Sequence, residues 1–274
     1  MYRVNLLKNI WNLFYAVSLS LGAYIAIESL VKFGDIKNFI GFSLALLGIF
    51  ILEIYITWQR NVLINNERLD KKLIEYELIH IIHKIFLPIL LYLAIVGYGY
   101  YNFYLLHMKL ILFMSFVTNF LLFVNIKAFF EHKSKIEQST NFVFDFIKFV
   151  IYWALVDVIY NFSLQLEFQK AFITFSVFLL TTIVVELFAI RTSPRHLFSF
   201  YYGVGSGVFN AILSLILVST SELNGFEFSV ILTLSFYLII STLYHFTKKN
   251  LSYYIVFEYV LVLASVIAII LGSY

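Results

Sequence analysis

Five of the acidic and amide residues inside long apolar segments of this sequence could form a site, because a polar side chain there has no water to bind. They are Glu258, Glu186, Asp157, Asn210 and Asn119. If the segments cross a bilayer, burying such groups is costly, so they mark ion or proton pathways or else pair with one another. Together, their carboxylate and amide oxygens would form a cation or proton site. The alternative is that each makes an ordinary hydrogen bond to a neighbouring helix.

Glu258 lies deeper within its apolar segment than the other acids lie in theirs. It follows Lys249 by nine residues, which corresponds to about 13 Å at the rise of an α-helix. Asp157 and Glu186 are each about five residues from an end of their segments. We therefore expect Glu258 to be the acid that contributes most to an intramembrane site.

Three glycines, Gly203, Gly205 and Gly207, occur within five residues of one apolar segment. Membrane transporters often bind substrate where a spanning helix is interrupted at such residues. The spacing therefore predicts a helix break here. Close packing of two helices is the alternative explanation for the same glycines.

Four basic residues form a candidate contact for lipid phosphate: Arg191, Arg195, Lys248 and Lys249. Basic residues beside spanning helices attract anionic headgroups. The same residues are also explained by the excess of Lys and Arg in cytoplasmic loops.

Several chemistries are excluded or receive no support. The chain has no cysteine, which excludes disulfides and thiolate chemistry. Glu77, His80 and His83 share a helix face, as in metal-binding bundles, but no second motif of that kind occurs. We therefore predict no catalytic residue, metal or cofactor. The net charge of +3 is small, and it predicts no binding to nucleic acid.

Composition decides the fold class. Of the 274 residues, 62% are hydrophobic and 13% are charged, with a mean hydropathy of +0.90. The apolar runs are continuous and about 20 residues long, which is typical of membrane helices rather than barrel strands. We predict an all-α integral membrane protein, a single transmembrane domain over 1–274 with nine spans, or eight where neighbouring runs merge. The spans are 10–31, 38–57, 85–105, 109–130, 141–161, 171–190, 197–219, 226–246 and 251–271.

Basic residues predict the orientation. Fourteen Lys and Arg residues fall at the N-terminus and in every second loop, and four fall on the opposite side. The positive-inside rule then places the N-terminus in the cytoplasm or its organellar equivalent. The longest loop, 60–84, mixes apolar and charged residues in a helical pattern and predicts an amphipathic helix on that face.

Three functions remain open from the sequence. The buried acids and the glycines favour a small transporter or channel-like protein for an ion or solute. Short loops without a complete motif favour an accessory subunit of a larger membrane complex, for example of the respiratory or ATP synthase type. The basic cluster favours an intramembrane enzyme acting on lipid. Of the two, however, we expect a protein that is not an enzyme rather than one that is. Expected partners are the lipid bilayer and other membrane subunits or further copies of the chain, in a bacterial or archaeal cytoplasmic membrane or an organellar inner membrane.

Overall fold

The computed structural model is mostly helical over the residues that it describes. The described residues are 2–65, 87, 89–102, 112–113, 115–122, 137–192, 196–220, 223–247 and 252–272. Regular structure in these ranges is helix alone, with no strand. The predicted all-α class is therefore confirmed.

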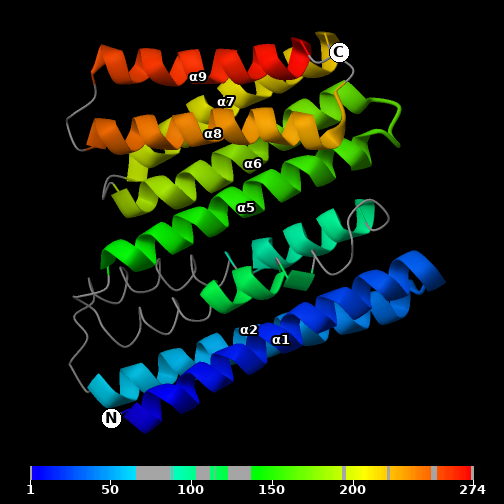
Figure 1. The fold of residues 1–274 in the computed structure, drawn as a ribbon, viewed down its shortest axis with the longest axis vertical. Coiled ribbons are helices and arrows are strands. Elements are labelled where there is room, and N and C mark those ends of the chain that lie inside the picture. The colour runs from blue at the N-terminus through cyan, green and yellow to red at the C-terminus, as the bar shows by residue number, and fades with distance from the viewer. Residues whose placement is uncertain are drawn as a thin grey trace. The chain divides into compact units, whose positions relative to one another are not determined.

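Seven long helices make up most of the described chain (Figure 1). They are α1 (Tyr2–Phe33), α2 (Ile36–Asn65), α5 (Glu137–Ser163), α6 (Gln169–Thr192), α7 (His196–Thr220), α8 (Gly225–Thr247) and α9 (Tyr253–Gly272). The predicted spans 85–105 and 109–130 are described only in part, by the helical stretches within 89–102 and 115–122.

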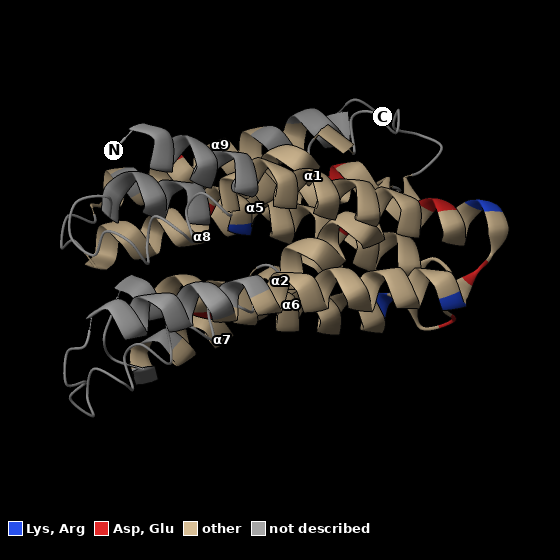
Figure 2. Cartoon of the chain, turned by 90° about the horizontal axis from the view of Figure 1, so that it is seen from below, with Lys and Arg blue, Asp and Glu red and all other residues tan. Residues whose placement is uncertain are grey.

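The apolar length of these helices identifies a multi-pass membrane protein. Among the described residues, five stretches are long and apolar enough to cross a bilayer: Leu13–Phe33, Asp145–Ser163, Gln169–Ala189, Phe200–Thr220 and Gly225–Thr247. Shorter apolar stretches lie at Ile36–Leu52, Ile89–Tyr101 and Val256–Ser265. Most of the described ribbon carries neither a basic nor an acidic residue (Figure 2). The count of nine spans and the orientation remain predictions.

Contacts divide the chain into two compact units, Met1–Ile151 and Tyr152–Tyr274. In the first unit α1 packs on α2. The turn between them requires glycine at Gly34, which has a φ of 64° and donates its N–H to the Leu30 carbonyl at 3.1 Å. This is a left-handed helix cap. Asp35 then caps α2, because its carboxylate accepts the Asn38 N–H at 3.0 Å.

The first unit also contains an ion pair within one helix. Asp145 and Lys148 lie three residues apart on α5, and their side chains are 3.5 Å apart. The Lys148 side chain is fully buried, so its charge needs this carboxylate nearby. The amphipathic segment predicted at 60–84 is described only to Asn65, where α2 ends, and its remainder lies outside the described residues.

In the second unit, α6 packs along α7, α8 contacts both α6 and α7, and α9 packs on α8 (Figure 1). The start of α8 is fixed by a reciprocal pair of hydrogen bonds. Glu227 N–H donates to Asn224 Oδ1 at 3.0 Å, and Asn224 N–H donates to the Glu227 carboxylate at 3.1 Å. This capping box satisfies amides that would otherwise have no partner at the helix end.

Candidate functional site

Asn210 of α7 lies at the centre of a buried group of polar side chains in the second unit. Its amide Nδ2 donates to the Tyr152 hydroxyl at 3.0 Å and to Thr181 Oγ1 at 3.5 Å. Ser235 Oγ donates to Asn210 Oδ1 at 2.6 Å. The Tyr152 and Thr181 hydroxyls share another hydrogen bond at 2.9 Å. We call Tyr152, Thr181, Asn210 and Ser235 the Asn210 network, to which α5, α6, α7 and α8 each contribute one residue.

Packing holds this network in a single arrangement. All four members are at most 1% exposed. The Tyr152 ring stacks on Phe236, with ring centroids 4.1 Å apart and an angle of 11° between the planes. Phe188 contacts Phe236 edge-on, with ring centroids 5.8 Å apart. The Tyr152 hydroxyl therefore has little freedom to leave its partners.

The chemistry available to the Asn210 network follows from its neutral groups. An amide and three hydroxyls carry no net charge at neutral pH, and each polar side chain has a partner within the network. A cation entering here would have to replace these hydrogen bonds with ligand bonds. The arrangement therefore corresponds to the interhelical hydrogen bonding named above as the alternative for Asn210.

Asp157 lies elsewhere in the second unit, against the start of α8. It is 1% exposed, and its carboxylate accepts a hydrogen bond from Asn161 Nδ2 at 3.1 Å. A Cβ added to Gly225 would come within 2.8 Å of Asp157 Oδ1, so the backbone of α8 approaches the carboxylate closely. A negative charge at a helix N-terminus is stabilised by the helix dipole. The nearby start of α8 thus explains how the Asp157 carboxylate can be buried here.

Glu258 and Glu186 do not join the Asn210 network. Glu258 is exposed on α9, whereas Asn210 is fully buried. Along α9, which begins at Tyr253, Glu258 lies about 7.5 Å from the start of the helix. Glu186 is half-buried, on the face of α6 that meets Gly203. Within the second unit, the expected convergence of Glu258, Glu186 and Asn210 is therefore not observed.

Asn119 belongs to the first unit and has partners of its own. Its Nδ2 lies 3.3 Å from Ser115 Oγ and 3.5 Å from Ser20 Oγ. The two serine hydroxyls are 3.2 Å apart. This is a second neutral group of buried polar side chains, linking α1 to the helical stretch that contains Ser115.

The three glycines of α7 lie within an unbroken helix, which corrects the predicted helix break. α7 continues from His196 to Thr220. A Cβ added to Gly207 would come within 2.2 Å of Thr182 Oγ1 and 2.8 Å of the Phe178 carbonyl oxygen. Gly203 faces the Thr182 carbonyl oxygen in the same way, at 3.2 Å. Gly203 and Gly207 therefore allow α7 to approach α6 closely. Gly205 has no atom within 4 Å of its Cβ position.

The proposed phosphate contacts are not described in the structure. Arg191 is the last residue but one of α6, but its side chain is not described. Arg195, Lys248 and Lys249 lie outside the described residues. Their role in binding lipid phosphate remains a prediction.

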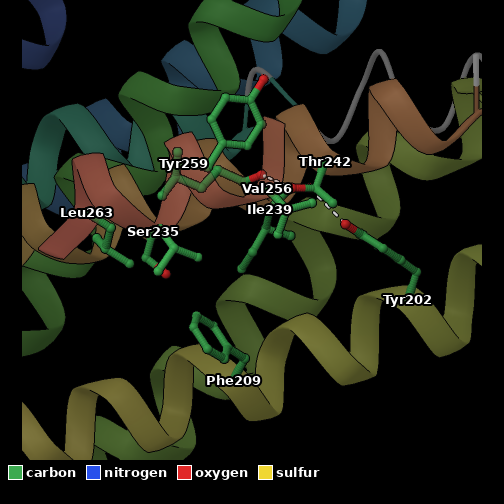
Figure 3. Close-up of a pocket in the computed structure, with 10 residues that line it drawn as sticks. Tyr202, Phe209, Ser235, Ile239, Thr242, Val256, Tyr259 and Leu263 are labelled. Atoms are coloured by element: carbon green, nitrogen blue, oxygen red, sulfur yellow. Dashed lines mark hydrogen bonds between the residues drawn. The ribbon is translucent and has the colours of Figure 1, made fainter. Parts of the chain in front are cut away.

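A groove between α7, α8 and α9 is a feature that the sequence does not indicate (Figure 3). Its volume is about 170 Å³, and its lining is Tyr202, Phe209, Ser235, Leu238, Ile239, Thr242, Val256, Tyr259, Val260 and Leu263.

Sequence reasoning also missed three members of the Asn210 network. For Tyr152 a signal existed, because this tyrosine is in the middle of its apolar segment, away from the ends where interfacial tyrosines gather.

No three His, Asp or Glu side chains in the described ranges come together as a metal site would require. Neither a protein-family model, nor a curated protein, nor a solved structure matches this chain.

Proposed function

We propose that this protein is an accessory subunit of a larger membrane complex and that α9 binds a neighbouring subunit. The observation that supports the proposal is the position of Glu258. This acid is exposed on α9, among exposed apolar residues that include Phe257 and Leu261. In a single-chain protein, a charge within a spanning helix is expected to face the interior of the bundle.

The negative charge of Glu258 determines what kind of partner would bind this face of α9. An acid on a lipid-facing helix is stabilised by a cation at the same depth, since hydrocarbon provides neither water nor hydrogen bonds. The partner we expect is a transmembrane helix with a Lys, Arg or His opposite Glu258. Tyr253 and Tyr254 at the start of α9 are 94% and 83% exposed and suit a position at the membrane surface. Glu258 lies just over one turn deeper than these tyrosines.

Co-purification in mild detergent tests the proposal. We expect a stoichiometric membrane partner with the native chain and its loss in Glu258→Gln, because the amide cannot form the ion pair. Glu258→Asp should retain part of the binding. Glu167→Gln is the matched control, since Glu167 is exposed in the turn between α5 and α6 and its substitution removes the same charge. A native chain that purifies as a monomer without partners would refute the proposal.

Transport of an ion or small solute is the second candidate function. The observation that favours it is the Asn210 network, where polar side chains from four helices meet inside the second unit. Proteoliposomes with an entrapped pH-sensitive dye and imposed Na⁺ or K⁺ gradients would test this function. Transport through the network predicts flux that Asn210→Ala abolishes and that Ser214→Ala, a change on the same helix, leaves intact. The absence of flux under both gradients would count against ion transport.

A further inference from the structure

We propose that the groove between α7, α8 and α9 holds one acyl chain of a membrane lipid. One stretch of each helix lines the groove: from Tyr202 to Phe209, from Ser235 to Thr242 and from Val256 to Leu263 (Figure 3). Each stretch advances seven residues, which corresponds to roughly 10 Å along a helix. The groove is therefore a channel about 10 Å long and open on one side.

Three of the four polar side chains in the walls, those of Tyr202, Ser235 and Thr242, already have partners. The Tyr202 hydroxyl donates to the Ile239 carbonyl at 2.8 Å, and Thr242 Oγ1 donates to the Leu238 carbonyl at 2.8 Å. The Ser235 hydroxyl is engaged by the Asn210 network. What remains for an occupant is apolar side-chain surface and one tyrosine hydroxyl, that of Tyr259. Ordered water needs two to four polar partners, so this groove favours hydrocarbon over water.

The surroundings of the groove favour an acyl chain as its occupant. The groove is a space of about 170 Å³ between three helices, which suits a slender, flexible chain. At its rim, Phe209 is 52% and Val260 59% exposed. Because α7 and α8 are long and apolar enough to cross a membrane, the medium at this rim is lipid.

The depth of the groove matches one leaflet. Tyr202 is two residues from the start of the apolar stretch Phe200–Thr220, and Thr242 is five residues from the end of Gly225–Thr247. The groove thus begins roughly 3–8 Å below one membrane surface and extends inward by about 10 Å, within a half-bilayer of about 15 Å. His245 lies near the same end, its ring centroid 6.3 Å from that of Tyr259. The positive-inside prediction makes this the cytoplasmic leaflet.

Photo-crosslinking with a phospholipid that carries a diazirine in its acyl chain tests the proposal. The full chain in phosphatidylethanolamine–phosphatidylglycerol vesicles is irradiated, and the labelled residues are located by mass spectrometry. We expect Leu238 on α8 and Val260 on α9 to be labelled at least several-fold more strongly than Val262, which is exposed on α9. Val260→Trp should fill the groove and reduce labelling of Leu238 by several-fold. Val262→Trp, the matched control two residues away, should leave it unchanged.

Several outcomes would overturn the inference. Equal labelling of Leu238 and Val262 in the native chain would mean that lipid contacts the surface without entering the groove. Preferential labelling by a diazirine sterol or isoprenoid probe would assign the groove to another class of lipid. Labelling of Leu238 that persists in Val260→Trp would place the chain elsewhere. The comparison within the native chain remains decisive if Val260→Trp fails to fold, and it is independent of any partner bound through Glu258.

Discussion

The hydrogen bond between Ser235 and Asn210 should couple α8 to α7, and a double-mutant cycle can measure this coupling. The perturbations are Asn210→Ala, Ser235→Ala and the two combined. The bond is short, at 2.6 Å, and Asn210 and Ser235 are 0% and 1% exposed. Tyr152 and Thr181 keep their own 2.9 Å bond when Asn210 is truncated. The cycle therefore isolates the α7–α8 bond from the rest of the network.

The expected coupling follows from the burial of this bond. Interhelical hydrogen bonds in membranes contribute about 0.6 kcal/mol on average and at most about 1.7 kcal/mol. Complete burial and a short length place this bond in the upper half of that range. The Ser235 hydroxyl can, however, turn to a carbonyl of its own helix once Asn210 is gone, which limits the loss. We expect a coupling of about 1–1.5 kcal/mol, a 5- to 13-fold change in the unfolding equilibrium constant.

Reversible unfolding in mixed detergent and SDS micelles is the assay, with helix content as the signal. The control cycle pairs Ser235→Ala with Ser214→Ala. Ser214 is also fully buried on α7, but its hydroxyl donates to the Ala211 carbonyl of the same helix at 2.8 Å. The control coupling should stay below about 0.3 kcal/mol. An Asn210–Ser235 coupling no larger than the control would refute the reasoning.

Three further predictions follow from helix packing, capping and orientation. Gly207→Ala should destabilise the fold by about 1–3 kcal/mol through overpacking, whereas Gly205→Ala should change stability by less than about 0.5 kcal/mol. Equal effects of the two substitutions in the same unfolding assay would contradict this prediction. Asn224→Ala should cost about 1 kcal/mol by removing the cap of α8, and an unchanged unfolding midpoint would show that the cap is dispensable. Because the chain has no cysteine, single-cysteine variants can report orientation. An impermeant maleimide added outside should label Lys37→Cys but not Lys249→Cys, and the reverse pattern would invert the predicted topology.

Hydropathy predicted the helical elements well, because the apolar run that fills the membrane is itself the signal. The predicted spans 171–190, 197–219 and 226–246 each differ by one or two residues at either end from α6, α7 and α8. Helix ends outside the apolar runs need a second signal. α2 continues to Asn65, eight residues past the predicted span end at 57, into the segment 60–84 that is predicted to be an amphipathic helix. Backbone hydrogen bonding extends a helix past the membrane boundary, and hydropathy does not record this extension.

Helix neighbours could not be predicted, and so the candidate site could not be predicted either. Hydropathy is the same for an apolar residue that faces lipid and one that faces another helix, because both surroundings are apolar. The sequence therefore identified Asn210 as a polar residue in a span but not its partners on α5, α6 and α8. Gly203 and Gly207 show the same difficulty. Their spacing fits both a broken helix and a close helix contact, and only the position of α6 distinguishes the two.

The cost of burying charge explains how polar groups are distributed in the second unit. A neutral amide can be fully satisfied by hydroxyls from neighbouring helices, as Asn210 is, and then lies in the interior at little cost. A carboxylate needs a cation, a helix N-terminus or the membrane surface. Asp157 is buried beside the start of α8, whereas Glu258 is exposed on α9. The interior of this unit is thus suited to holding helices together, and a carboxylate on an outward-facing helix is suited to contact with another molecule.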